Sequence, residues 1–122
     1  MKSVLLVLVA LAFCMPITGA DKKELQQLNV EAKKFFESFS KALGKQGATE
    51  AAMHIAPKYR ERFNKGYRFW RGTKLHALGV IGLPDNEGVL RVKTQIVSPS
   101  GRKDTEIKKL LFAKDKWFLL ES

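Results

Sequence analysis

The segment Leu25–Leu43, LQQLNVEAKKFFESFSKAL, decides the fold of this 122-residue chain. Its apolar residues recur at steps of three and four, which places them on one face of an α-helix. Three phenylalanines belong to this stripe, so the helix needs a large apolar surface to cover. The stripe consists of Leu25, Leu28, Ala32, Phe35, Phe36, Phe39 and Leu43. We therefore predict a long helix that packs on another layer of structure.

From Thr73 onward the apolar period changes from 3.6 to two, which is typical of β-strands. Clusters of Pro, Gly, Asn, Asp and Ser separate the alternating runs, so consecutive strands are expected to be antiparallel. Gly79, inside the first run, predicts a bulge or a close approach of another segment. The predicted strands are 75–82, 90–96, 105–113 and 117–121.

Two short helices are predicted between the long helix and the first strand. The first spans Gly47–Ala56 and has small apolar residues on one side. Pro57 opens the second, which continues through Phe63, because proline is accepted in the first turn of a helix. Helices followed by a meander of strands give an α+β fold, with the helices packed on a four-stranded antiparallel sheet.

Length and cysteine content limit the classes of protein that are compatible with the chain. At this length it forms one small domain, which excludes a multidomain enzyme. Its only cysteine, Cys14, lies in an apolar run that follows Lys2 and ends at small residues, the pattern of a secretory signal peptide. We expect cleavage after Ala20, which leaves a single disulfide-free domain at 21–122.

The charge of the chain indicates the chemistry of its partners. The formal net charge is +10, and without Lys2 the remaining chain has 21 basic and 12 acidic residues, a net charge of +9. We expect an exported protein, periplasmic or secreted, with an anionic or amphiphilic partner. Outside the cytoplasm, lipid head groups, acidic polysaccharides and acidic proteins are more accessible than nucleic acid.

The order of elements and two phrases resemble the NTF2-like superfamily, which has a cystatin-like α+β roll. The first phrase is AAMHIAPKYRERF at 51–63, in which Pro57, Tyr59 and Phe63 match proline, x, aromatic, three residues, aromatic. The second is KDKWFLLES at 114–122, a charged turn followed by Trp117. The resemblance implies a pocket between helix and sheet. The superfamily includes isomerases, dehydratases, ligand binders and secretion components, so the resemblance does not select one function.

The segment Lys58–Lys74 combines seven basic residues with five aromatic residues and one acid, Glu61. Tyr59, Phe63 and Tyr67 recur every four residues, which favours a role in the core. The residues from Arg68 onward depart from that stripe. Their combination of basic and aromatic side chains predicts a surface that binds anions, with the aromatic side chains entering the interface. We call this surface the basic aromatic rim. It consists of Arg68, Phe69, Trp70, Arg71 and Lys74.

The candidate pocket residues are His54, Tyr59, Tyr67 and His76. Glu50 and His54 have helical i, i+4 spacing, but a zinc site needs further ligands that the sequence lacks. We expect no metal, cofactor or catalytic residue, because most acids lie in turns or beside lysines.

Three hypotheses for the function remain. The preferred one is a non-catalytic binding domain, monomeric or homodimeric. A second is an isomerase or dehydratase in which a histidine carries the proton, a tyrosine donates a hydrogen bond and Trp70 forms the pocket wall. The third is a structural subunit of an envelope assembly that uses the face or edge of its sheet.

Overall fold

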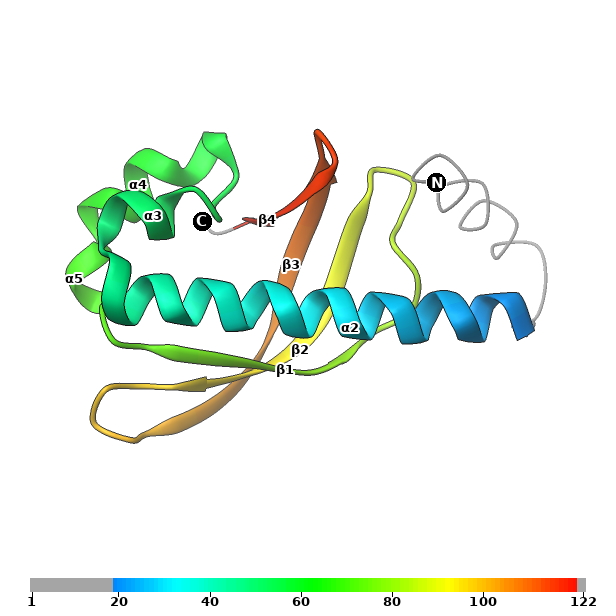
Figure 1. Ribbon diagram of the computed structural model, residues 1–122, viewed down its shortest axis with the longest axis horizontal. Helices are drawn as coiled ribbons and strands as arrows, with labels where there is room; N and C mark the ends of the chain where they lie inside the picture. The colour runs from blue at the N-terminus through cyan, green and yellow to red at the C-terminus, as the bar shows by residue number, and fades with distance from the viewer. Residues whose placement is uncertain (1–18, 121–122) are drawn as a thin grey trace.

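The computed structural model describes residues 19–120 (Figure 1). The helical elements are α2 (Gly19–Lys41), the π-helical turn η1 (Ala42–Gln46), α3 (Ala48–Ala52), the 3-10 turn η2 (Pro57–Tyr59), α4 (Arg60–Lys65) and α5 (Tyr67–Trp70). The strands are β1 (Lys74–Val80), β2 (Val89–Val97), β3 (Lys103–Ala113) and β4 (Lys116–Leu120). The predicted signal peptide lies outside the described residues except for Gly19 and Ala20, which begin α2, and it stays a prediction.

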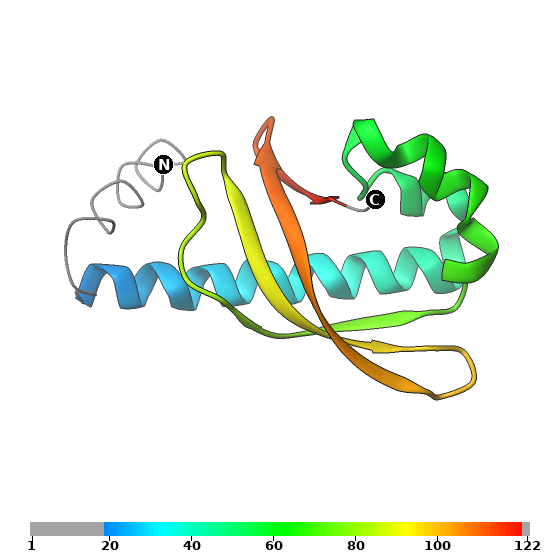
Figure 2. The ribbon, with the colours of Figure 1, turned by 180° about the vertical axis from the view of Figure 1, so that it is seen from behind.

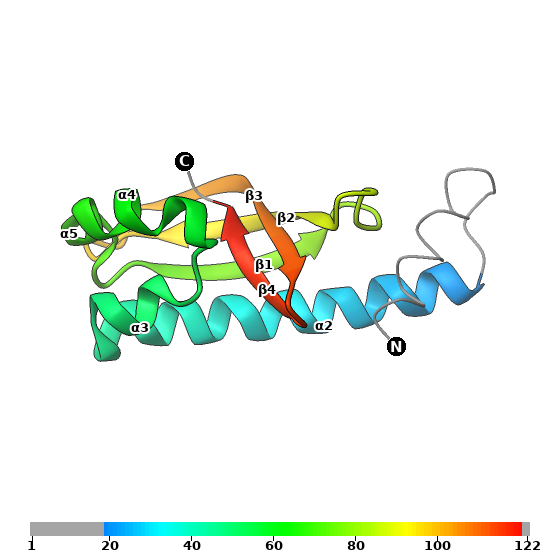
Figure 3. The same cartoon turned by 90° about the horizontal axis from the view of Figure 1, so that it is seen from above.

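The strands form one antiparallel meander in the order β1-β2-β3-β4. The register of β1 on β2 shifts between Ala77 and Gly79, which confirms the bulge expected from the glycine. Figure 2 shows β2 and β3 crossing in front of α2, and Figure 3 places α3, α4 and α5 near the C-terminal end of α2. The predicted α+β class, with a long helix and short helices on a four-stranded antiparallel sheet, is confirmed.

The phenylalanine stripe of α2 faces the sheet and forms the centre of the core. Phe36 and Phe39 have no exposed surface, and Phe35 packs against them from the margin. On β2 the alternating residues Leu90 and Val92 are fully buried. Burial of such side chains is worth about 1.5–3 kcal/mol each, so the helix and sheet stabilise one another chiefly through this contact.

Helix α2 also covers the free edge of β1. The Ser40 hydroxyl accepts a hydrogen bond from the Leu75 amide (2.8 Å) and donates one to the Leu75 carbonyl (3.1 Å). Three turns earlier, the Asn29 side-chain oxygen accepts a hydrogen bond from the Val80 amide (3.0 Å). Asn29 and Ser40 are eleven residues apart in the helix, and their partners in β1 are five residues apart in the strand. Both separations correspond to about 16.5 Å, so the two contacts fit a helix and a strand that run antiparallel. Backbone groups that a free edge exposes are thereby satisfied at two positions.

The opposite edge of the sheet is covered by the segment between α3 and η2. The Ala56 amide donates to the Leu119 carbonyl (2.9 Å), and the Leu119 amide donates to the His54 carbonyl (2.8 Å). Ile55 and Leu119 therefore form a parallel bridge. The predicted helix over 47–56 is wrong in its last four residues, because this pairing with β4 takes their backbone groups after α3 ends at Ala52.

The other short helices also differ from the prediction in their boundaries. Pro57 opens a 3-10 turn rather than an α-helix, and α4 then continues to Lys65, two residues beyond the predicted end. A four-residue helix, α5, follows Gly66, where the sequence predicted no separate helix. Tyr67 and Trp70 pack on the core, and this tertiary contact outweighs the weak helical signal of such a short segment.

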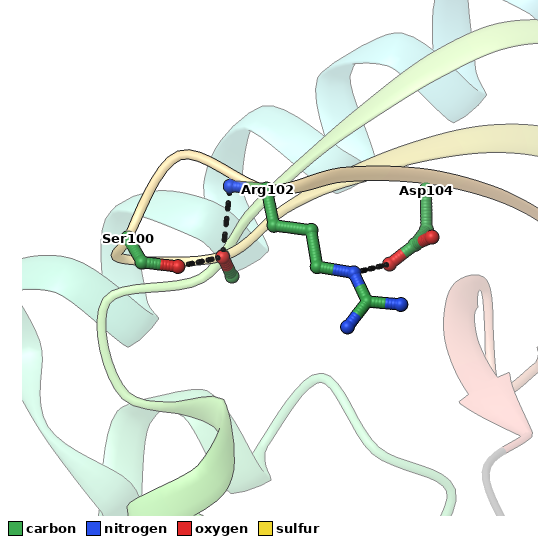
Figure 4. A network of polar contacts seen from close by, with 4 residues as sticks. Ser100, Arg102 and Asp104 are labelled. Carbon is green, nitrogen blue, oxygen red and sulfur yellow. Dashed lines mark hydrogen bonds and ion pairs between the residues drawn. The ribbon is translucent and has the colours of Figure 1, made fainter.

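Two turns complete the sheet. Between β2 and β3, the Ser98 hydroxyl contacts the Ser100 hydroxyl (2.8 Å) and accepts from the Arg102 amide (3.1 Å), while the Arg102 guanidinium pairs with Asp104 (3.4 Å) (Figure 4). Between β3 and β4, Lys114 and Asp115 both have positive φ, at 51° and 64°. Two consecutive positive φ angles are typical of a type I′ hairpin, which confirms the tight charged turn.

Candidate functional site

The basic aromatic rim begins on α5 and ends at the first residue of β1. Gly66 separates α5 from α4, and Gly72, with φ 78°, turns the chain from α5 into the sheet. The Gly72 amide donates to the Leu43 carbonyl (3.1 Å), which fixes the segment to the end of the long helix. A Cβ at Gly72 would lie 3.3 Å from the Pro99 side chain, so the rim lies against the β2–β3 turn.

Trp70 anchors the rim to the core. Its ring centroid lies 5.7 Å from those of Phe39 and Phe63. The Lys108 ammonium stands 5.5 Å from the Trp70 centroid on the inner side of the sheet. Trp70 is half-buried, so it supports the rim from below.

The exposed surface of the rim consists of Arg68, Phe69, Arg71 and Lys74. Phe69 is 74% exposed, and the Arg68 guanidinium carbon lies 4.9 Å from its ring centroid. A guanidinium within about 6 Å of an aromatic ring gains a cation–π attraction and keeps its remaining N–H donors directed to solvent. The rim thus presents an exposed apolar ring next to Arg68, and its arginines can form bidentate contacts with phosphate or carboxylate.

Two of the four basic residues that precede the rim have structural contacts of their own. Arg60 donates from Nε to the Ala52 carbonyl (3.1 Å) and the Ile55 carbonyl (2.9 Å), so it closes the end of α3. Lys65 pairs with Glu61 (3.4 Å) one helical turn away. Tyr59 and Tyr67 pack on the core, as their spacing with Phe63 predicts. The anion-binding part of the segment is therefore narrower than its composition suggests.

One surface hollow adjoins the rim at Lys74. It has a volume of about 310 Å³ and lies between the C-terminal end of α2 and the start of β1. His76, one of the candidate pocket residues, lines it and is exposed. The residues around it are Glu37, Ser40, Lys41, Gly44, Lys45, Lys74, Leu75 and His76.

A second hollow, of about 330 Å³, contains the other histidine. His54 lies there with Glu31 and Trp117. The Trp117 indole donates to Glu31 Oε1 (2.6 Å), and Gln27 donates to Oε2 (3.2 Å), so both carboxylate oxygens are engaged. His54 Nδ1 lies 3.1 Å from the Glu50 carbonyl, which directs the imidazole back toward the helix.

The candidate pocket residues are not gathered in one place. His54 and His76 line different hollows, and neither hollow is lined by Tyr59, Tyr67 or Trp70. The Glu50 group that lies against His54 is the backbone carbonyl oxygen, 3.1 Å from Nδ1. Within residues 19–120 no group of three or more His, Cys, Asp and Glu side chains is placed to hold a metal ion.

Glu31 and Trp117 are neighbours of His54 that the sequence does not indicate. Glu31 belongs to the polar side of the predicted helix, and Trp117 lies in the last strand, 86 residues later. Only the packing of β4 beside α2 brings them together. Among the described residues, Gly19 to Leu120, no helix is both long enough and apolar enough to cross a membrane.

Comparison with known proteins identifies the fold. No protein-family model and no curated protein matches the chain. Among solved structures, the chain is similar to a protein of unknown function with a cystatin-like fold from Nostoc punctiforme. The two are 16% identical, with a TM-score of 0.54 over 87% of this chain and 90% of that chain. The protein therefore has a cystatin-like α+β fold, and a fold of this kind is compatible with many functions.

Proposed function

We propose that the protein is an exported, non-catalytic binding domain of the NTF2-like superfamily whose basic aromatic rim takes an anionic or amphiphilic ligand. The observation that carries the proposal is the placement of Phe69, which is 74% exposed with the Arg68 guanidinium over its ring. An isolated exposed apolar residue is ordinary on a protein surface. Here the ring is in contact with the Arg68 guanidinium, on a segment that Trp70 and Gly72 hold in place.

The chemistry of the rim suggests how such a ligand is bound. Arg68 and Arg71 offer planar N–H donors to a phosphate or carboxylate, and Lys74 adds a flexible positive charge. Phe69 supplies contact for an apolar portion next to the anionic group. Lipid head groups, acidic polysaccharides and acidic protein segments all carry such an anionic group. An amphiphilic ligand contacts the rim cations with its anionic group and Phe69 with its apolar portion.

The enzyme hypothesis has less support from the geometry. An acid and base couple needs two groups within hydrogen-bonding distance of one substrate. The two histidines lie in separate hollows, and each shares its hollow with a glutamate, His54 with Glu31 and His76 with Glu37. Glu31 already accepts hydrogen bonds from Trp117 and Gln27, and in the described residues Glu37 and His76 are not hydrogen-bonded to each other. The binding hypothesis needs no such couple.

The proposal is tested by titrating the purified protein with dihexanoylphosphatidylglycerol, a lipid that is monomeric in solution. The variant Arg68→Glu/Arg71→Glu is expected to bind at least about tenfold more weakly, since a hydrogen bond to a charged group contributes about 1.5–3 kcal/mol. The control, Lys23→Glu/Lys33→Glu, changes the net charge equally on exposed positions of α2. Equal affinity of the rim variant and the parent rejects the rim as the site.

Native mass spectrometry of protein purified from its own envelope or medium identifies the ligand class independently. A retained anionic or amphiphilic molecule that the rim variant does not retain supports the proposal. A retained neutral, fully apolar molecule contradicts it.

A further inference from the structure

The outer face of the sheet is the side of β1, β2 and β3 that points away from α2 (Figure 2). One edge is satisfied by Ser40 and Asn29, and the other pairs with the backbone around Ile55. In Figure 2, no helix crosses in front of β2 or β3. The contacts at the two edges protect part of each edge, and β4 pairs with β3 only from Lys109 to Ala113.

The outer face is uniformly basic. Alternation along β1, β2 and β3 places five lysines and arginines and one histidine on it, and all of them are exposed. None of the strand residues that alternate onto this face in the described chain is acidic. The six residues are Lys74, His76, Arg91, Lys93, Lys103 and Lys109.

Within residues 19–120, none of the lysines and arginines of this face forms an ion pair. Arg91 and Lys109 are directly opposite in the register of β2 and β3, an arrangement of like charges that destabilises a sheet. The acids of β3 pair with other cations: Asp104 with Arg102 (3.4 Å, Figure 4) and Glu106 with Lys108 (4.0 Å). The pattern therefore favours an anionic partner outside the chain.

Apolar side chains lie among these cations. Ile107 is 56% exposed and is directly opposite Lys93. Leu78, the extra residue of the bulge in β1, is 53% exposed in the neighbouring strand, next to Gly79, which also pairs with Lys93. A linear polyanion offers charge without an apolar interior, whereas a bilayer offers both an anionic surface and hydrocarbon beneath it. The cations are also spread over three neighbouring strands rather than along one line, and several of them can therefore contact head groups of the same membrane surface.

We propose that the outer face of the sheet is a docking surface for an anionic lipid bilayer. Lysines and arginines approach the head groups, and Ile107 and Leu78 enter the boundary between head groups and acyl chains. This surface is distinct from the basic aromatic rim, and the two meet at Lys74, which belongs to both. Docking depends on salt, because electrostatic attraction to the membrane surface is limited to about a Debye length.

The experiment measures co-sedimentation of the full-length protein with vesicles of phosphatidylglycerol and phosphatidylcholine in equal parts. Each lysine near an anionic membrane strengthens binding about fivefold, so Lys93→Gln/Lys109→Gln is expected to lower the partition coefficient about 25-fold. Ile107→Ser is expected to lower it several-fold without any change of charge. Lys23→Gln/Lys33→Gln, which neutralises exposed lysines on α2, leaves partitioning close to that of the parent.

Three results overturn the proposal. The first is a Lys93→Gln/Lys109→Gln protein that partitions like the parent while circular dichroism shows it folded. The second is a loss of heparin binding as large as the loss of vesicle binding, with no effect of Ile107→Ser, which indicates a linear polyanion. The third is complete loss of vesicle binding in Arg68→Glu/Arg71→Glu alone. The two proposals can fail independently, because the rim is tested by binding of a monomeric lipid and the outer face by binding of vesicles.

Discussion

Replacement of Ser40 by alanine tests how α2 is attached to the sheet. The Ser40 hydroxyl forms two hydrogen bonds with one residue of the β1 edge, to the Leu75 amide (2.8 Å) and carbonyl (3.1 Å). Leu75 is only 1% exposed, so water has little access to its backbone once the hydroxyl is removed. The substitution Ser40→Ala therefore leaves a buried donor and a buried acceptor without their partner.

The expected loss of stability follows from these contacts. Each hydrogen bond contributes about 1 kcal/mol net, and a buried polar group left unsatisfied costs about 1–3 kcal/mol. Alanine is the better helix former and returns about 0.5 kcal/mol. We expect Ser40→Ala to lower the free energy of unfolding by about 2 kcal/mol, which corresponds to a decrease of roughly 10 °C in Tm for a domain of this size.

The assay is urea unfolding followed by circular dichroism, with Ser38→Ala as the matched control. Ser38 lies on the same helix and is exposed, so its substitution tests helix propensity alone. The midpoint should fall for Ser40→Ala and stay equal or rise for Ser38→Ala, with the same dependence on urea in both. Surface substitutions usually change the free energy of unfolding by no more than about 0.5 kcal/mol. If the free energies of the two variants differ by less than that, the Ser40 hydroxyl does not hold the helix on the strand.

Two other substitutions on α2 are informative. Asn29→Ala removes the hydrogen bond from the Val80 amide and should lower the free energy of unfolding by about 1 kcal/mol in the same urea titration. Its effect should add to that of Ser40→Ala, because the two residues lie about 16.5 Å apart on the helix. Burial, together with Glu31 and Asp21, raises the pKa of Glu24 above its ordinary value of 4.5, so stability decreases as pH rises through the folded-state pKa. Glu24→Gln should be more stable than the parent at pH 7 and equal to it below pH 4.5, where folded and unfolded chains are both protonated; a constant difference between these pH values contradicts this assignment.

The main elements of the fold follow from local patterns. The spacing of the phenylalanines predicts α2, since Phe36 and Phe39 can share a buried face only in a helix. Alternation predicts β2, where Leu90 and Val92 are buried and Arg91 and Lys93 are exposed. These signals are strong because burial and secondary-structure period agree along the whole segment.

Contacts between distant segments carry no such local signal. Ser40 and Asn29 lie beside the apolar stripe and resemble solvent-facing residues until β1 is in place. Lys108 alternates with Leu110 and shares its inner face, where a lysine is not expected. Its ammonium reaches the Trp70 ring, 5.5 Å from the centroid, which allows the charge to remain at the margin of the core. A single sequence does not indicate which of its aromatic residues accepts that charge.

The outer face of the sheet separates the requirements of folding from those of binding. The inner face must be apolar to bury α2, but positions such as Arg91 and Lys109 contribute no side chains to the core. Folding alone favours opposite charges at directly facing positions, so two cations there reduce stability. Neutralising Lys109 relieves this repulsion and removes a charge from the proposed docking surface. A variant that loses vesicle binding while its stability is maintained or raised therefore assigns the charge to binding, because a merely structural role would require the two quantities to fall together.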